Sequence, residues 1–400
     1  MIVYTYYSAP WSLRSGDSIR IHNLCRVLKN NASMLIAFNL SHLVDEYVTV
    51  YKDNVLYVSI PRKFYRLLAK LFKWKDRKDL NALVKLTHYI DEFITVTKLI
   101  KYIKNNETKI TYIFGSMSLF SFFTHILKVK SVSVYDPLAN YAQTLYLLSR
   151  RSFKERIKYC LYLALHKLQL RSSNYIIYPS KIDLENAKHM FNINKAFIVP
   201  NPVPICYESI EEYIKLRSKR MEFNKPYFVL MAGSRSNVNK EAVKATIKIF
   251  NEVPSNEFKL LITGPWQDMK KYVNNKSIEI LGVVPHNKLK EILAMADYGL
   301  TPIFSHIAGT FLKSLAYIAV GLNLITSPWG IAGIDTSLLR DKQIFIVRNT
   351  REYKKAIYAA ISSPKIRKPN ESVAITICSK NATDVNMYLQ KVLEALKSRS

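Results

Sequence analysis

The sequence predicts an α/β fold built from two doubly wound, Rossmann-like parallel-sheet domains. Three observations predict it: the chain has 400 residues, 49% of them are apolar, and short apolar runs alternate with helical patterns. Strands that are apolar throughout are typical of parallel sheets covered by helices on both faces. In such folds ligands bind at the carboxyl ends of the strands, so we expect two crevices that face each other across a cleft.

The alternation runs along nearly the whole chain. The predicted strands occupy 1–6, 33–38, 54–60, 110–114, 130–135, 174–178 and 196–199, then 227–232, 258–263, 278–281, 297–301 and 322–326. The predicted helices occupy 17–30, 62–104, 116–128, 150–171 and 180–191, then 238–251, 286–295, 309–320, 350–362 and 382–398.

A proline-rich and strongly charged stretch interrupts this alternation at 200–226. Proline at both ends and a dense charge run are typical of an interdomain connector. We therefore predict an N-terminal domain over 1–205, a linker over 206–225 and a C-terminal domain over 226–381. The final amphipathic helix, 382–398, can pack back on the first domain.

The bulk composition excludes several classes of protein. Glycine is rare, with 10 residues in 400, which excludes collagen-like and glycine-rich chains. The four cysteines are far apart and form no C-x-x-C pair, so we expect free thiols in a reducing compartment. The N-terminus is predicted to be a strand rather than a signal peptide. The apolar run 314–334 contains Gly321, Pro328 and Gly330, so we expect a helix, a turn and a strand there rather than a membrane span.

The net charge of +29 has three interpretations: a solvated basic surface, nucleic-acid binding, or attraction to an anionic membrane. The densest basic cluster, 61–78, interleaves its cations with apolar and aromatic residues at helical spacing. That pattern is typical of a helix lying on a membrane surface. The alternative is a helix that packs on its own domain with its lysines extended into water. The membrane or acceptor contacts expected from the first domain are Arg20, Phe64, Arg66, Lys70, Lys73 and Trp74.

Two segments of the second half combine a helix start with cations. Gly233 follows a predicted strand, and Arg235 and Lys240 follow in the loop and at the helix start. Gly309 and Thr310 open a second helix that carries Lys313 in its first turn. Free backbone N–H groups and cations at a helix start suit a phosphate group. Each segment taken alone is also compatible with ordinary helix caps and solvated surface cations.

In the first half, Gly16 lies in the turn between the first predicted strand and the helix 17–30, and Asp136 directly follows the predicted strand 130–135. A carboxylate at a strand end is a candidate general base, although Asp136 before Pro137 is also a good helix cap. The sequence has no G-x-G-x-x-G, no phosphate-binding G-x-x-x-x-G-K-[ST] and no D-x-D. Its eight histidines show no metal-binding spacing, so no metal and no cofactor is expected.

Five motifs occur in a characteristic order: VPNPVP at Asn201, MAGSRSNVNK at Gly233, LLITGPW at Gly264, ILGVVPHNKLKEILAMADYGLTP at Gly282 and GTFLKSLAYIAVG at Gly309. Together they resemble the retaining GT-B glycosyltransferases, particularly glycosyltransferase family four (group 1). The resemblance spans nearly the whole chain and is strongest over 226–334.

The resemblance implies a glycosyltransferase that moves a hexose from a UDP- or GDP-linked sugar to a hydroxyl acceptor, lipid-linked or glycan, without a metal and with retention of configuration. It implies catalytic roles for Asp136, Arg235 and Lys240. The donor-binding residues it implies are Gly16, Asn201, Gly233, Arg235, Lys240, Gly264, His306, Gly309, Thr310 and Lys313. With the basic helix, it implies a peripheral protein on the cytoplasmic face of a membrane.

One departure from the family pattern supports an alternative. The C-domain glutamate that typically holds the donor ribose is Ala316 here, and its upstream partner falls at Ala308. A catalytically inactive GT-B scaffold that binds a sugar or a partner is therefore a second hypothesis. A basic nucleic-acid-binding protein is a third.

Overall fold

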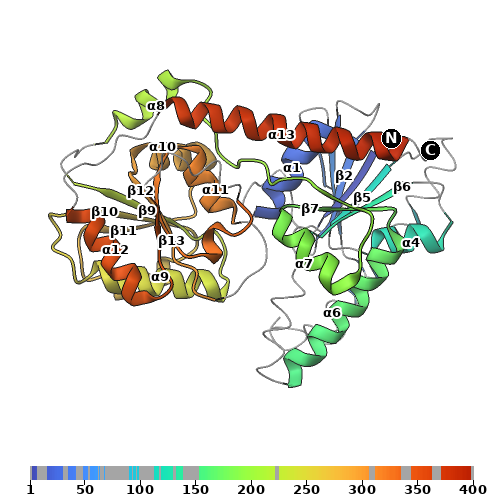
Figure 1. The fold of residues 1–400 in the computed structure, drawn as a ribbon, viewed down its shortest axis with the longest axis horizontal. Coiled ribbons are helices and arrows are strands. Elements are labelled where there is room, and N and C mark those ends of the chain that lie inside the picture. The colour runs from blue at the N-terminus through green and yellow to red at the C-terminus, as the bar shows by residue number, and fades with distance from the viewer. Residues whose placement is uncertain are drawn as a thin grey trace. The chain divides into compact units, whose positions relative to one another are not determined.

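The computed structural model shows two α/β units (Figure 1). It describes residues 2–6, 16–29, 35–41, 48–52, 55–61, 63, 67, 90–91, 93–95, 97–98, 112–116, 119–128, 132–137, 153–220, 225–305, 311–334, 344–362 and 371–397. Unit 1 comprises Met1–Leu13, Asp17–Pro200 and Val385–Ser400, and unit 2 comprises Arg14–Gly16 and Asn201–Asp384. The α/β class and the parallel sheets predicted from the sequence are confirmed.

Unit 1 is built on a sheet of eight described strands in the order β3-β4-β2-β1-β5-β6-β7-β8. The strands are β1 (Ile2–Tyr6), β2 (Leu35–Ser41), β3 (Val48–Lys52), β4 (Val55–Pro61), β5 (Tyr112–Ser116), β6 (Val132–Asp136), β7 (Tyr175–Tyr178) and β8 (Ala196–Ile198). All described pairings are parallel except that of β3 with β4. Strand β3, which the sequence did not predict, is thus an antiparallel edge strand on a parallel sheet.

The described helices of unit 1 are α1 (Gly16–Leu28), α4 (Phe120–Ile126), α6 (Phe153–Ser172) and α7 (Lys181–Phe191). Helix α13 (Glu371–Lys397) also contributes, because its residues from Val385 onward belong to this unit. Val385, Leu389 and Val392 of α13 are buried in one cluster with Ile21 and Leu24 of α1. The C-terminal helix therefore forms part of the unit 1 core.

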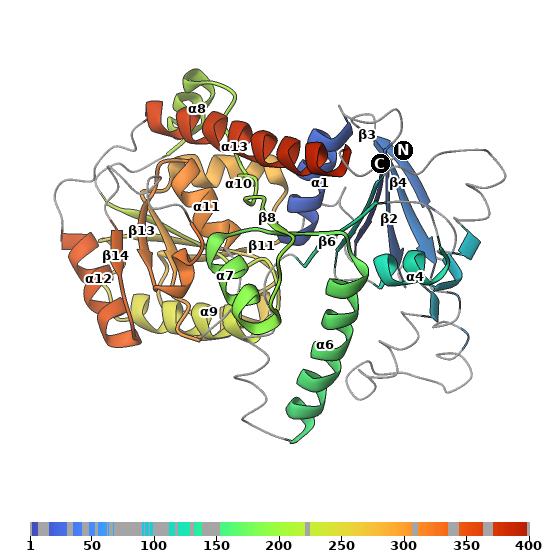
Figure 2. The ribbon, with the colours of Figure 1, turned by 45° about the vertical axis from the view of Figure 1, so that its right-hand side comes forward.

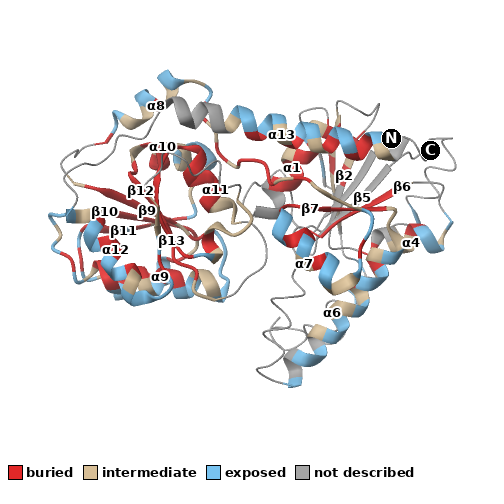
Figure 3. Cartoon of the chain, viewed as in Figure 1, coloured by how far each residue is buried: buried red, intermediate tan, exposed pale blue. Residues whose placement is uncertain are grey.

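Unit 2 is built on a sheet of six described strands in the order β11-β10-β9-β12-β13-β14, all parallel. The strands are β9 (Tyr227–Met231), β10 (Lys259–Thr263), β11 (Ile278–Gly282), β12 (Tyr298–Thr301), β13 (Asn323–Thr326) and β14 (Ile344–Ile346). The helices are α8 (Ile210–Arg217), α9 (Asn237–Phe250), α10 (His286–Met295), α11 (Leu312–Ala319) and α12 (Thr350–Ser362), with 3₁₀ turns η3 (Gln267–Tyr272) and η4 (Trp329–Ile331). Buried residues cover both faces of this sheet (Figure 3), as its uninterrupted apolar strands predict.

A buried carboxylate ties together the amino ends of the two central strands of unit 2. Asp297 is fully buried and accepts hydrogen bonds from Arg217 at 2.9 Å and from Arg220 at 2.7 Å. The backbone N–H of Tyr227 donates to the same carboxylate at 2.9 Å. A buried carboxylate is tolerated only with such partners, because desolvation penalises an unpaired charge heavily.

Both arginines come from the segment that the sequence analysis assigned to a linker, 206–225. The structure instead folds Ile210–Arg217 of this segment as helix α8 of unit 2, with Tyr207 and Tyr213 buried in the core beside α10. Arg220 also lies 4.3 Å over the ring of Tyr227. Two of the charges that resemble a solvated connector, Arg217 and Arg220, therefore have a buried partner.

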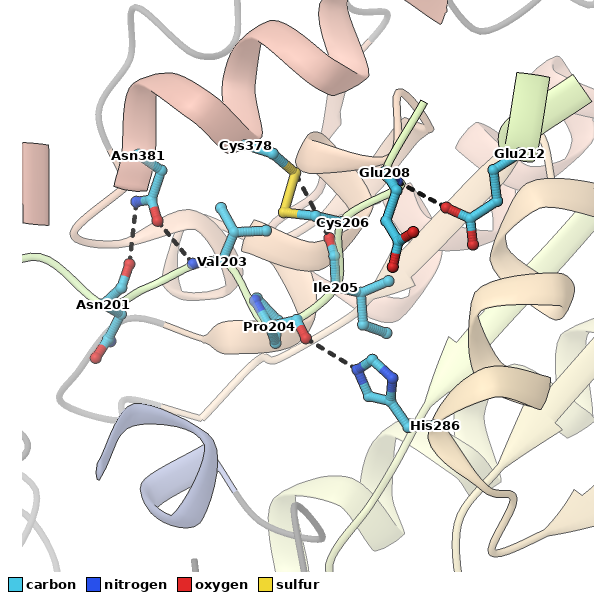
Figure 4. Close-up of a disulfide and its surroundings, with 10 residues drawn as sticks. All are labelled: Asn201, Val203, Pro204, Ile205, Cys206, Glu208, Glu212, His286, Cys378 and Asn381. Carbon is cyan, nitrogen blue, oxygen red and sulfur yellow. Dashed lines mark hydrogen bonds between the residues drawn. A yellow bond between two sulfur atoms is a disulfide. The ribbon is translucent and has the colours of Figure 1, made fainter. Parts of the chain in front are cut away.

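The structure contradicts the expectation that all four cysteines are free thiols. Cys206 and Cys378 form a disulfide with a Cα–Cα distance of 5.9 Å (Figure 4). The two residues are 172 positions apart, and both lie in unit 2. Sequence spacing gave no signal, because only the tertiary fold brings the two positions within bonding range. Cys25 is buried and free, and Cys160 is exposed and free.

Asn381 reinforces the same junction one turn further along α13. Its side chain donates to the carbonyl of Asn201 at 3.1 Å and accepts from the N–H of Val203 at 2.7 Å (Figure 4). The first and last segments of unit 2 are therefore joined by a covalent bond and two hydrogen bonds.

Within the described part of the chain, no helix is both long enough and apolar enough to cross a membrane. The apolar run 314–334 divides into α11, β13 and η4, as its glycines and proline predict.

We expect the disulfide to stabilise unit 2 against unfolding, because it closes a long loop and restricts the unfolded chain. Replacing both Cys206 and Cys378 by Ser should lower the free energy of unfolding by about 2–5 kcal/mol, measured by urea titration. The control is Cys25→Ala, which leaves the disulfide intact. A non-reducing peptide map in which the oxidised protein shows no linked Cys206 and Cys378 peptides would contradict the assignment.

Candidate functional site

The candidate site lies at the carboxyl edge of the unit 2 sheet. Because the described strands are parallel, β9, β10, β12 and β13 all end at this edge, where α/β folds bind ligands. The loop after β9, residues 232–236, leads directly into α9. The hydroxyl of Ser236 caps this helix by accepting from the N–H of Asn239 at 3.3 Å. The helix start therefore presents backbone N–H groups and a positive dipole end to this edge.

A glycine allows β9 and β10 to approach closely at this edge. Gly264 has a φ of +117°, and a Cβ at this position would lie 2.0 Å from the carbonyl oxygen of Ala232. The indole N–H of the buried Trp266 donates to that same carbonyl at 2.6 Å. Gly264 was expected to contact the donor. Packing alone explains why this position is a glycine, because a side chain here would collide with the backbone that precedes the 233–236 loop.

Arg235 extends from this loop beside Trp266 and η3. Its guanidinium donates to the Asp268 carboxylate at 2.8 Å and lies 5.7 Å from the ring centre of Trp266. Both charged side chains are about half exposed, at 58% and 48%. An exposed ion pair of this kind contributes at most about 1 kcal/mol, so an arriving anion can displace Asp268.

Asn239 connects the loop to the neighbouring helix α11. Its amide nitrogen donates to the carbonyl and the hydroxyl of Ser234, each at 3.0 Å. Its amide oxygen accepts from the ammonium of Lys313 at 2.9 Å. This side chain therefore links the Lys313 ammonium to the 232–236 loop, a role that was not predicted from the sequence. No local sequence signal could have found it, because the bond to Lys313 joins residues 74 positions apart.

Lys313 lies in the first turn of α11 and is partly buried. Burial lowers the pKa of its ammonium from the ordinary 10.5 to about 8. A cation with few solvent contacts gains more from an added anion than a solvated one does. Lys240, which was expected to share this role, lies exposed in the first turns of α9.

Several other expected donor residues have definite places. Gly233 is exposed in the loop, and Gly16 is the first residue of α1. Asn201 is buried, and its carbonyl accepts from Asn381. Ala316 is fully buried in α11 and packs in the unit 2 core.

The remaining expected residues lie outside the described part of the chain. They are His306, Gly309 and Thr310 of the donor set, and Phe64, Arg66, Lys70, Lys73 and Trp74 of the membrane or acceptor set.

In unit 1, Asp136 ends β6 as expected, and it is fully buried. Its carboxylate accepts from Arg20 Nε at 3.1 Å and from Arg20 Nη2 at 3.3 Å. Arg20 Nη1 donates to the carbonyl of Val199 at 3.0 Å. The pair joins α1, the carboxyl end of β6 and the segment after β8. This arrangement indicates that the pair stabilises the fold of unit 1. The acceptor role of Asp136 stays a prediction.

Within the described residues, no group of three or more His, Cys, Asp or Glu side chains could hold a metal ion.

Comparison with known proteins decides the fold. No family model matches the sequence, and no curated protein matches it. Solved structures match it over their full length. Sucrose-phosphate synthase from Thermosynechococcus elongatus has a TM-score of 0.72 at 10% identity, covering 100% of this chain and 99% of its own. The chain has the GT-B fold.

Two further GT-B structures match over similar lengths. A trehalose-6-phosphate protein from E. coli, bound with UDP-2-fluoro glucose, has a TM-score of 0.65 at 14% identity and covers 100% of this chain and 99% of its own. WaaG, a glycosyltransferase involved in lipopolysaccharide biosynthesis, has a TM-score of 0.65 at 11% identity, with 99% of each chain covered. At such low identity the GT-B likeness shows the fold, and the chemistry rests on the residues of this chain.

The lowered pKa of Lys313 makes the stability of unit 2 depend on pH. The unfolded chain keeps the Lys313 proton up to about pH 10.5, whereas the folded chain releases it near pH 8. Stability contributed by this group therefore rises with pH across that window, by up to about 3 kcal/mol relative to Lys313→Met. Urea titrations of both proteins at pH 7, 8.5 and 10 measure the difference. A constant difference across this range would show that Lys313 titrates normally.

Breaking the Arg20–Asp136 pair should destabilise unit 1. Either Arg20→Met or Asp136→Asn alone leaves an unpaired buried partner and should cost about 3–5 kcal/mol in urea unfolding. The matched control is Lys181→Met, which removes an exposed 3.7 Å pair with Glu185 and should cost under about 1 kcal/mol. An equal loss of unfolding free energy in all three variants would contradict a stabilising role for the buried pair.

Proposed function

We propose that this protein is a glycosyltransferase that moves a hexose from a nucleotide-diphosphate donor to a hydroxyl acceptor. One observation carries the proposal: at the carboxyl edge of a GT-B unit, Asn239 holds the Lys313 ammonium against the loop that opens α9. The full-length fold match to a protein bound with UDP-2-fluoro glucose supports the same chemistry. We infer that the donor is UDP- or GDP-linked.

The proposed chemistry is electrostatic stabilisation of the leaving diphosphate. Negative charge develops on the diphosphate as the bond to the sugar breaks, and fixed cations and helix N–H groups stabilise that charge. Lys313 and the start of α9 supply one side of this environment, and Arg235 supplies the other once the diphosphate replaces Asp268. Lys240, exposed in the first turns of the same helix, is proposed as an additional contact.

The nucleoside is proposed to bind without the ribose contact typical of the family. Ala316 has no hydrogen-bonding side chain and is fully buried, so it cannot hold a hydroxyl. A carboxylate at this position would lose its hydrogen-bond partner when a deoxyribose donor binds, and the protein would then discriminate against that donor. With Ala316 there is no such carboxylate, so we expect weaker discrimination between ribose and deoxyribose donors.

The acceptor is proposed to be a lipid-linked or glycan hydroxyl. One of the matching structures takes part in lipopolysaccharide biosynthesis, and the charge of +29 suits an anionic membrane face. We propose transfer with retention and without a metal, by a protein held peripherally on a membrane face.

A non-catalytic GT-B scaffold is the second candidate, and Ala316 favours it. The two proposals differ in their use of a donor: only the first predicts that the protein binds a nucleotide sugar and releases nucleoside diphosphate from it. The assay incubates purified protein with UDP-sugars and GDP-sugars, such as UDP-glucose and GDP-mannose, with and without a chelator. It measures the release of nucleoside diphosphate.

Removing the proposed clamp should weaken nucleotide binding. Arg235→Met and Lys313→Met should each reduce the affinity for the productive nucleoside diphosphate by about 10–100-fold, because each removes a charge-assisted contact. Lys240→Met should have a smaller effect, since this side chain is exposed. Isothermal titration calorimetry with UDP and GDP provides the measurement.

The matched control is Lys244→Met, which removes an exposed cation one turn further along α9 and should leave affinity unchanged. Unchanged affinity in both Arg235→Met and Lys313→Met would overturn the proposed clamp.

A further inference from the structure

Helix α6 carries a row of large apolar side chains that are exposed. Its large exposed apolar side chains are Phe153, Ile157, Leu161 and Leu168, with exposed fractions of 75%, 46%, 54% and 38%. At 100° per residue these four positions fall within about 80° of the helix circumference. We call them the α6 stripe. Phe153 and Leu168 are separated by 15 residues, so the stripe is about 23 Å long.

The opposite side of α6 packs on unit 1 with polar and aromatic groups. His166 is 2% exposed and Gln169 is 3% exposed. His166 Nδ1 and the hydroxyl of Tyr135 share a hydrogen bond of 2.9 Å, and the His166 ring stacks on the ring of Tyr162. Surface helices normally turn their apolar side to the core and their polar side to water. On α6, Leu170 also packs against the unit 1 core, whereas the four residues of the α6 stripe are exposed, so the stripe is not the packing face of this helix.

The charges beside the stripe indicate what kind of surface it contacts. Arg156 and Lys167 are exposed along one border of the stripe, and Arg171 is exposed at its C-terminal end. Over its whole length α6 carries five basic residues and one acid. Two copies of such a helix would repel each other, and the chain as a whole carries +29. An apolar stripe bordered by cations matches the interface of an anionic lipid bilayer, where acyl chains lie beneath negative headgroups.

We propose that the α6 stripe docks this protein onto an anionic membrane, with the helix lying in the plane of the headgroups. In Figures 1 and 2 the N-terminal turns of α6 extend beyond the strands of unit 1, where Phe153 begins the stripe. This inference gives the proposed membrane partner a defined surface, separate from segment 61–78, and it does not depend on sugar transfer.

The chain offers a natural probe for this surface. Cys160 is exposed on α6, beside the stripe and one helical turn from Ile157, whereas Cys25 is buried and Cys206 is paired with Cys378. An environment-sensitive fluorophore should therefore label the folded, oxidised protein at Cys160 alone. Its emission reports directly whether the exposed side of α6 enters an apolar phase.

The experiment compares full-length labelled protein with vesicles of phosphatidylcholine alone and with 40% phosphatidylglycerol. We expect a blue shift and co-sedimentation only with the anionic vesicles, both weakening as salt rises. The double variant Ile157→Ser, Leu161→Ser should reduce vesicle affinity at least tenfold. The matched control, Ile182→Ser with Ile214→Ser, removes two isoleucines that are each 49% exposed on α7 and α8, and it should bind like the parent protein.

Three outcomes overturn the proposal: no preference for anionic vesicles, equal loss in the stripe and control variants, or a blue shift that grows with protein concentration in the absence of vesicles. The last would assign the stripe to contact between two copies. Calorimetric binding of UDP and GDP by the stripe variant should equal that of the parent, which separates this proposal from the proposed donor site. If neither protein binds a nucleotide, the vesicle result still decides the docking surface.

Discussion

The organisation of unit 2 depends on one buried carboxylate. Asp297 lies at the amino end of β12, one of the two central strands, and is fully buried. Its charge is tolerable only because Arg217 and Arg220 donate to it and the backbone of Tyr227 completes its hydrogen bonds. This requirement brings α8 onto the unit, aligns β9 with β12, and so sets the carboxyl edge at which both strands end.

The opposite edge combines rigid and adjustable parts. The backbone after β9 is fixed by the close approach at Gly264 and by the Trp266 indole. Arg235 on the following loop is exposed, and its pair with Asp268 is weak enough to exchange. Asn239 joins the two helices that open here, since it bonds both Ser234 and Lys313. A site for a diphosphate benefits from this combination. Preorganised donors lose little entropy on binding, and the Arg235 guanidinium can exchange Asp268 for the negative charge that develops on the diphosphate.

Unit 1 shows two uses of arginine and lysine in the same basic chain. Arg20 is buried and is engaged by Asp136 and the carbonyl of Val199, so its charge supports the fold. Arg156, Lys167 and Arg171 of α6 are exposed beside apolar side chains, so their charge is available to an external surface. The net charge of +29 therefore does not describe a single function, and burial decides which charges act outside the molecule.

The sequence by itself determined the α/β class, the two-unit organisation and most strands, because alternating apolar runs are local signals. Its five ordered motifs carried the GT-B resemblance. It also placed Arg235 and Lys313 near helix starts, since glycines and caps are local as well. Only the tertiary structure decided the rest. It paired Cys206 with Cys378 across 172 positions, gave Arg217 and Arg220 a buried partner, and showed Asn239 between two helices. These features join residues distant in sequence, and no local pattern records which distant groups will meet in a folded core.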